Sequence, residues 1–231
     1  MKQMGGVRAV ASAIQTATGA QMLFPTADAT SEEGEIVGEN VAVSTGETTV
    51  GQANMGVYKY SSKSIALPFE LLQDSFIDIE AYIKSLLALR LGRIQNRHQT
   101  VGTGTGQPRG IVTGASVGKT GATGQTTSVT YDDLVDLEHS VDPIYRSRAA
   151  WMFHDDVLKV LRKIKDTQGR PIFVPGYEQG NPGGAPDRLM GRAININQNM
   201  AAMAANAKSI LYGDFSTVSY THLTLPTKRI V

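Results

Sequence analysis

The stretch that decides the fold runs from Leu67 to Ile111 and reads LPFELLQDSFIDIEAYIKSLLALRLGRIQNRHQTVGTGTGQPRGI. Apolar residues recur in it at steps of three and four, which is the period of one helix face. The members of this face are Ile79, Ile83, Leu86, Leu87 and Ile94. The pattern predicts a helix from Phe76 to Gln99 that packs on a sheet, longer than the usual globular helix of about 10–14 residues.

The ends of this helix carry the expected signals. Ser75 is the predicted N-cap, and Asp78 three residues later completes a variant of the capping box. Acidic side chains at Asp78 and Glu80 begin the helix and basic side chains close it, which suits the helix dipole. The basic residues are Arg90, Arg93 and Arg97. Gly102 is the predicted stop.

Composition bounds the class of protein. The chain has 231 residues, 41% of them hydrophobic, which is enough for one large or two small domains. A net charge of +1 does not demand a nucleic acid or an anionic membrane as partner. The absence of cysteine excludes disulfides and thiolate metal sites and fits assembly in a reducing cytoplasm. We find no signal peptide and no apolar run near the ~20 residues of a membrane span.

Three short motifs of this stretch show a resemblance to a known family through their order and spacing. They are ELLQDS, FIDIEAYI and GTGTGQPRGI. They resemble the major capsid proteins of tailed bacteriophages, whose fold is named after phage Hong Kong ninety-seven. Later segments match the same family: YRSRAAWMF, LRKIKDTQGRPIF, LMGRAININ and ILYGDFS. The resemblance runs from about Gly19 to Ser216.

This resemblance implies an α+β fold with a set order of parts. Residues 1–26 would be an N-terminal arm, and residues 27–66 an extended β-hairpin, the E-loop, laid across the adjacent subunit. Residues 67–112 would hold the long spine helix and part of the peripheral domain. Residues 113–216 would form the small α/β axial domain, which gathers around the five- and six-fold axes.

The residues themselves also favour a hairpin in the second part. An acidic tract runs from Asp28 to Glu47 without a lysine or arginine, and Val41, Val43 and Thr49 alternate around Gly46. Such a hairpin alone is marginal in water, so a partner surface would explain it. Before it, TGAQMLFPT reads as extended, and a weak helical pattern covers Val7 to Gln15.

Residues 112–130 are nearly all Gly, Thr, Ser and Ala, which predicts a loop. Thr130 and Asp133 then cap a helix that Pro143 ends. Beyond it, residues 145–217 read as a small α/β unit. Its predicted strands are RAAWMF, RAININ and AKSILYGDF, and its predicted helix opens at HDD, residues 154–156, with an aspartate as cap.

The last residues break the pattern. VSYTHLTLPT can be back-translated without a gap as a sequencing-library transposase adapter, so residues 217–231 are interpreted as an assembly artefact. A divergent natural tail is the alternative. If the artefact interpretation holds, the chain is C-terminally truncated and lacks the closing strands of the family.

Three motifs could indicate a nucleotide-binding, dinucleotide-binding or metal site. Gly114–Thr120 has three residues between its glycines where a Walker loop has four, and no helix signal follows, so a flexible linker fits better. The turn GTGTGQ closes a helix, whereas a dinucleotide fingerprint opens one. His154, Asp155 and Asp156 could form a metal or acid–base cluster, but a helix start accounts for them.

The sequence therefore predicts a structural subunit of an icosahedral phage head, without enzymatic activity, cofactor or metal. A nucleotide-binding enzyme using Gly114–Thr120 is the alternative, and a small-ligand module in the α/β unit a third. Partners would be copies of the chain in hexamers and pentamers, with non-specific packaged DNA, and scaffold, portal or decoration proteins, but no membrane. Its place would be the virion, assembled in the bacterial cytoplasm. The candidate subunit-interface residues are Glu32, Glu33, Glu35, Glu39, Arg90, Arg93 and Arg97.

Overall fold

The computed structural model describes residues 6–16, 21–27, 33–46, 50–68, 78–165, 168–169, 173 and 188–223. The chain divides into two compact units. The first comprises Met1–Ala13 and Tyr58–Ser219, and the second comprises Ile14–Val57 and Tyr220–Val231. Mixed helix and strand confirm the predicted α+β class.

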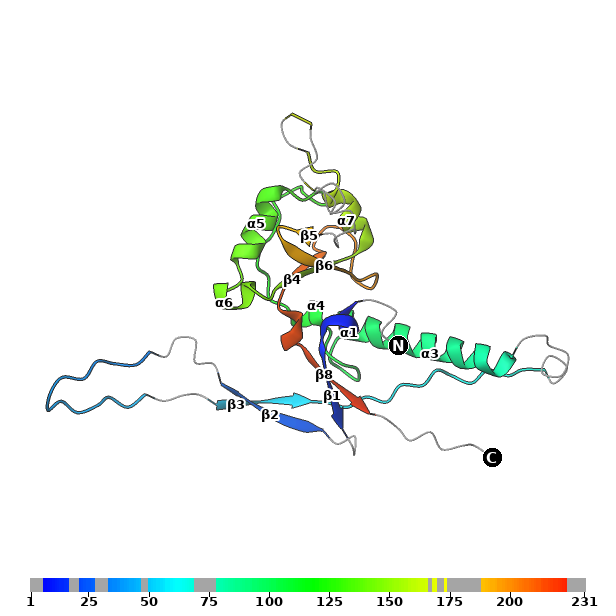
Figure 1. The fold of residues 1–231 in the computed structure, drawn as a ribbon, viewed down its shortest axis with the longest axis horizontal. Coiled ribbons are helices and arrows are strands. Elements are labelled where there is room, and N and C mark those ends of the chain that lie inside the picture. Colours follow the sequence, from blue (N-terminus) through cyan, green and yellow to red (C-terminus); the bar gives the residue numbers. More distant parts are fainter. Residues whose placement is uncertain are drawn as a thin grey trace, which may run out of the picture. The chain divides into compact units, whose positions relative to one another are not determined.

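A four-stranded mixed sheet forms the centre of the first unit (Figure 1). Its order is β5-β6-β4-β7, with bounds Arg188–Leu189, Arg192–Ile196, Ala150–Phe153 and Ile210–Gly213. Strand β4 runs parallel to β6 and antiparallel to β7. The three strands predicted from RAAWMF, RAININ and AKSILYGDF are confirmed as β4, β6 and β7.

Strand β4 is the most buried element because both of its faces are covered. Trp151, Met152 and Phe153 are each 0% exposed. Side chains alternate along a strand, so Trp151 and Phe153 face one cluster and Met152 faces another. The Trp151 indole also donates a hydrogen bond to the carbonyl of Leu189 at 3.0 Å, so its one polar atom is satisfied.

Helices α5, Tyr131–His139, and α7, Asp155–Leu161, cover the Trp151 face. Helix α5 begins with the predicted capping box between Thr130 and Asp133. It ends at His139, and Pro143 instead opens the short helix α6, Pro143–Arg146. The prediction that Pro143 ends α5 is therefore wrong, because proline suits the first turn of a helix, where its missing N–H costs nothing.

Helix α7 has its predicted place but a different cap. The N-cap is His154, whose Nδ1 accepts a hydrogen bond from the backbone N–H of Asp156 at 3.1 Å. The predicted aspartate cap is wrong, although both aspartates lie in the first turn, where the helix dipole favours them.

The long helix α3 runs from Ile79 to Val101. Its N-cap is Asp78, whose carboxylate accepts from the N–H of Ala81 at 3.0 Å, so the predicted start at Phe76 is wrong. Ser75, the predicted cap, lies outside the described residues. The predicted stop at Gly102 is confirmed, and a glycine is needed there because a Cβ would meet the carbonyl oxygen of Pro108 at 2.1 Å.

The buried positions of α3 differ from the predicted apolar face. They are Ile79, Gly92, Asn96 and Thr100. Ile83, Leu86 and Leu87 are only half-buried, and Ile94 is 37% exposed. The helix packs against α1, Val7–Val10, and α4, Ile111–Gly114, where small and polar side chains let the backbones approach. The prediction that this face packs on a sheet is therefore corrected.

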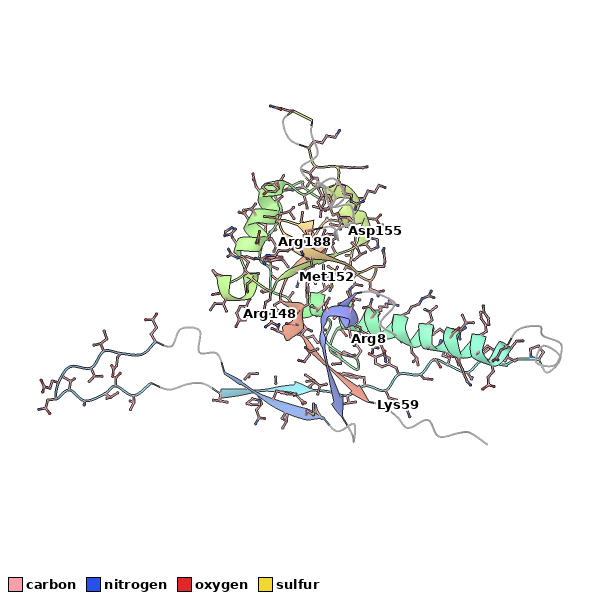
Figure 2. The ribbon with its side chains drawn as sticks, in the orientation of Figure 1. Arg8, Lys59, Arg148, Met152, Asp155 and Arg188 are labelled. Atoms are coloured by element: carbon pink, nitrogen blue, oxygen red, sulfur yellow. The ribbon has the colours of Figure 1, made fainter. Side chains whose placement is uncertain are left out.

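The other face of β4 is covered from both ends of the sequence. Met152 packs with Val7 of α1, Met200, Leu211 and Phe215, the first residue of η3, Phe215–Thr217. Figure 2 labels Met152 and Arg8 in this region. The predicted helical piece from Val7 to Gln15 is confirmed only for α1, because the chain then enters strand β1, Ser12–Thr16.

In the second unit, strand β2, Met22–Ala27, pairs antiparallel with β3, Val50–Met55. The register runs from Met22 opposite Met55 to Ala27 opposite Val50. No strand is assigned between them in residues 33–46, so the prediction of hairpin strands around Val41 and Val43 is wrong. The strands that pair are instead β2 and β3, which lie before and after the predicted hairpin residues in the sequence. Strand β2 falls within the range predicted to be the N-terminal arm.

Strands β1 and β8, Ser219–Leu223, form a separate two-stranded sheet. The N–H of Ser12 donates to the carbonyl of Val218 at 2.9 Å beside it. Strand β8 thus lies within the range interpreted as adapter sequence, while residues 224–231 lie outside the described part. The adapter interpretation stays a prediction.

Candidate subunit-interface surfaces

The first candidate surface is the basic stripe of α3. Arg90, Arg93 and Arg97 are spaced by three and four residues, so they share one helix face, and all three are exposed. Within the described part of the chain, none of their guanidinium groups has a hydrogen bond or an ion pair. The one ion pair along this helix joins Lys84 to Glu80 at 2.5 Å, one turn before the stripe.

The second candidate surface is the acidic tract of the other unit. Glu33, Glu35 and Glu39 are exposed, and Glu32 lies outside the described residues. Glu35 is already engaged: its two carboxylate oxygens accept from the hydroxyl and the N–H of Ser44, each at 2.6 Å. Both hydrogen bonds lower the pKa of Glu35, and the bond from the Ser44 hydroxyl has the larger effect. Glu33 and Glu39 are therefore the better candidates to meet a partner.

The contact between Glu35 and Ser44 also shapes the connection between β2 and β3. A turn at Glu39–Asn40 reverses the chain, with Asn40 in the left-handed region at φ 64° and the N–H of Val41 bonded to Gly38. Because Ser44 gives its N–H to a carboxylate, that N–H is not available for a β-ladder. This explains why the predicted strand pairing near Val43 does not form.

Apolar side chains are exposed on these surfaces, and the sequence pattern did not predict their exposure. Ile36 is 104% exposed, Val43 71% and Val41 62%. On α3, four leucines in six residues spread over more than half of the helix circumference, and each is only half-buried. They are Leu86, Leu87, Leu89 and Leu91. An apolar arc this wide exceeds the single apolar stripe of a surface helix, and this signal was present in the sequence.

A buried polar network ties α3 to the rest of the first unit. The side-chain amide of Asn96 donates to Asn197 Oδ1 at 3.1 Å and accepts from the N–H of Val7 at 3.2 Å. Asn197 donates to Thr100 Oγ1 at 2.9 Å. All three polar side chains are 5% exposed or less. Each buried group finds partners, so the network fixes how α1, α3 and the end of β6 meet.

Comparison with known proteins identifies the chain. The model of the phage capsid family matches residues 1–222. The chain belongs to the phage capsid family. No curated protein sequence matches it. Among solved structures, it is similar to the capsid of a native GTA particle computed with C5 symmetry, with 25% identity and a TM-score of 0.75 over 91% of this chain and 73% of that one.

Further structures extend the match. The capsid of the empty GTA particle, also computed with C5 symmetry, gives 25% identity and a TM-score of 0.74 over 100% of this chain and 80% of that one. A structure from Microbacterium phage Oxtober96 shares the fold at 16% identity and a TM-score of 0.64, covering 94% and 72% of the two chains.

The phage capsid family and its fold are those of a structural protein. The chain is accordingly a structural subunit of a capsid, a part of the virion that assembles with copies of itself. The predicted family and the predicted capsid fold are confirmed. The candidate interface residues stay predictions, because the capsid match does not say which side chains meet.

The alternative nucleotide site has no support in the structure of this capsid subunit. Helix α4 ends at Gly114, and the chain continues as a loop to Thr130 rather than entering a helix. Lys119, the residue that would meet phosphate, is bound to Asp136 and lies 3.8 Å from Asp133. The hydrogen bond with Asp136 raises the pKa of Lys119.

The predicted helix start at His154 accounts for the His-Asp-Asp cluster, since the imidazole nitrogen is used as a cap. The described residues hold no group of three or more histidine, cysteine or carboxylate side chains that could bind a metal ion. In the same part of the chain, no helix is long and apolar enough to cross a membrane.

Proposed function

We propose that this chain builds the shell of an icosahedral phage head that encloses a DNA genome. The observation that carries the proposal is the leucine set of α3, Leu86, Leu87, Leu89 and Leu91, which a single chain leaves only half-buried over more than half of the helix circumference. Copies of the same chain are the natural cover in a capsid family. The C5 symmetry of the two GTA capsid structures supports five-membered rings of subunits, and we propose hexamers beside such pentamers for this chain.

The second-unit hairpin, β2 and β3 with their connection, is in this proposal the E-loop that crosses a neighbouring subunit. Its side chains Ile36, Val41 and Val43 would lose water on docking, which favours the contact by about 25 cal/mol per Å² of apolar surface. The acidic residues would then meet the basic stripe of the neighbour's α3.

The charge part of this contact is small per pair but selective. A rim ion pair is worth about 0.2–1 kcal/mol, yet a shell repeats it on every subunit. Wrong registers would place like charges together, which disfavours them. The remaining proposed features are non-specific contact with packaged DNA, scaffold, portal or decoration proteins as further partners, no membrane contact, no enzymatic activity, and assembly in the bacterial cytoplasm.

Assembly of the purified full-length protein tests the proposal. We expect large particles in light scattering and negative-stain microscopy, and fewer particles as salt rises, because exposed pairs are screened over about 10 Å at 0.1 M. A species that stays monomeric across protein concentrations and salt would contradict the capsid proposal.

Charge reversal tests the hairpin contact separately. Glu33→Lys with Glu39→Lys should impair assembly at low salt while leaving thermal unfolding of the subunit unchanged. Adding Arg90→Glu and Arg93→Glu should partly restore assembly. The matched control is Glu33→Asp with Glu39→Asp, which keeps the charge and should assemble normally. If the lysine variant assembles like the unmodified chain at low salt, the acidic tract is only a solubilising surface.

A further inference from the structure

Two segments that cover the same face of the central sheet carry opposite charges. Residues 131–142, which include α5, read YDDLVDLEHSVD and hold five acidic residues. These are Asp132, Asp133, Asp136, Glu138 and Asp142. Residues 155–165, which include α7, read DDVLKVLRKIK and hold four basic residues after two aspartates in the first turn of the helix. These are Lys159, Arg162, Lys163 and Lys165.

The inner sides of both helices are used by the fold. Leu134 of α5 and Val157 and Leu161 of α7 are at most 2% exposed in one cluster around Trp151. Among the described residues, the outer sides carry exposed charges at Asp132, Asp136 and the three lysines. In Figure 1, α5 lies to the left and α7 to the right of strands β4 and β6, so on this shared face the acidic flank and the basic flank point in different directions.

The charges of the two flanks are only partly balanced within the chain. Lys119 pairs with Asp136, and Arg146 lies beside the acidic flank with its guanidinium on the carbonyl of Val141. The acidic flank therefore has two positive side chains, Lys119 and Arg146, beside its five negative ones. On the basic flank, Lys159, Lys163 and Lys165 have no ion pair with any described residue.

We propose that these flanks are the two halves of a head-to-tail contact between copies of this chain, with α5 of one subunit against α7 of the next. The inference rests on the proposed shell function and names one of its contacts. A two-fold contact would bring each flank against its own copy and place like charges together. A head-to-tail contact brings unlike charges together, and such contacts close into rings when the rotation permits.

Apolar surface beside the acidic flank supports a contact there. Helix α6 follows α5 directly, and its Ile144 is 77% exposed and its Tyr145 55% exposed. Interfaces combine an apolar patch with a charged rim. Ile144 and Tyr145 would supply the apolar part, and the acidic side chains would select the basic flank of the neighbour.

Four variants test the contact in the full chain under conditions where the unmodified chain assembles. Lys159→Glu with Lys163→Glu makes both flanks acidic. Asp132→Lys with Asp136→Asn makes the acidic flank more basic and spares the capping carboxylates. The third variant combines all four changes, and the control, Lys159→Arg with Lys163→Arg, keeps the charge.

Each single-flank variant should reduce the yield of particles at low salt by at least tenfold, measured by light scattering and microscopy. The combined variant should recover most of the yield, and the arginine control should match the unmodified chain. Thermal unfolding of the unassembled subunits should stay within a few degrees, which separates loss of contact from loss of fold.

Three outcomes would overturn the inference. Normal assembly of both single-flank variants would mean that the flanks do not meet. A failed rescue by the combined variant would mean that they act independently. If only the Lys159→Glu, Lys163→Glu variant forms otherwise normal particles that have lost packaged or added DNA, the basic flank binds a polyanion and not a neighbouring subunit. If the unmodified chain forms no particles, the proposed shell function fails first, before this contact is tested.

Discussion

Strands β4 and β3 illustrate two ways in which this chain uses extended backbone. Every central side chain of β4, from Trp151 to Phe153, is 0% exposed and has covered neighbours on both faces. In the hairpin, Val50 of β3 is 66% exposed and Leu23 of β2 is 61% exposed. Both regions contain large apolar residues, so composition alone does not distinguish them.

The difference lies in what covers each strand. Helices α5 and α7 and residues near both ends of the first unit bury β4, so that region contains its own core. A two-stranded hairpin is at best marginally stable in water. A subunit built this way can fold its central sheet alone and leave the hairpin to gain stability from the shell.

The largest expected effect comes from emptying the buried strand. Phe153→Ala should lower the free energy of unfolding of the unassembled subunit by about 3–5 kcal/mol, since a fully buried ring leaves a cavity. The matched change in the hairpin, Val50→Ala, should alter it by less than about 0.5 kcal/mol. Chemical denaturation measures both, and similar losses would refute the distinction between the two regions.

A smaller effect is expected at the polar network. Asn197→Leu should cost about 1–3 kcal/mol, because Asn96 and Thr100 would lose a buried partner. Changing Asn96 to leucine as well should cost less than the sum of the two single changes, since neither amide is then left unpaired. Additive losses in this double-mutant cycle would mean that the two asparagines do not act together.

The cap of α5 should contribute less again. Thr130→Ala removes the hydroxyl that accepts from the Asp133 N–H and donates to the Asp133 carboxylate, keeps the backbone half of the capping box, and should cost about 1 kcal/mol. Thr127→Ala, an exposed position just before it, is the control and should cost nothing measurable. Equal melting temperatures for the two variants would argue against the capping role.

The same cap has a pH dependence. Burial acts to raise the pKa of Asp133, but hydrogen bonds from Thr130 and Gln125 outweigh it and leave the pKa below the ordinary 3.8. The stabilisation is therefore present above pH 3.8 and lost as pH falls through the lowered value. The difference in melting temperature between Thr130→Ala and the unmodified chain should shrink in thermal melts at pH 3 and below. A difference in melting temperature that stays constant with pH would contradict this assignment.

The last prediction is that the hairpin forms no covalent cross-links with a neighbouring subunit. Some relatives join an E-loop lysine to an asparagine of a neighbour, but no lysine stands between Ser31 and Tyr58. Lys59 and Lys63 follow after β3. Assembled particles boiled in denaturant should therefore run as monomer on a gel, and a ladder of oligomers would show that a lysine outside the hairpin reacts.

Local signals made half of the fold predictable. RAAWMF, the box from Thr130 to Asp133 and the stop at Gly102 depend on residues that are close in sequence, and the structure confirms all three. The buried side of α3 was missed because Asn96 gains its partner from Asn197, which is 101 residues away. Polar residues read as exposed until such a partner is known.

The hairpin and the candidate site were harder to predict for the same reason. The pattern at Val41 and Val43 suggested a tight pair of strands, but the hydrogen bonds of Ser44 to Glu35 override it. Charge patterns located the exposed basic stripe and the exposed acidic tract correctly on the surface. Which of these side chains meet depends on a second subunit, and the sequence of one chain does not encode that geometry in any local pattern.

The pairing of β1 with β8 has a consequence for biosynthesis. The hydroxyl of Ser12 bonds to the carbonyl of Ser216, 204 positions later in the chain. A ribosome that adds about 5–20 residues per second needs roughly 10–40 s to make that span. During this time β1 has been synthesised but has no partner strand, so its unpaired edge is open to other nascent chains. The edge of β1 is therefore satisfied only after the segment around Ser216 has been synthesised, which separates the synthesis of β1 from its pairing in time.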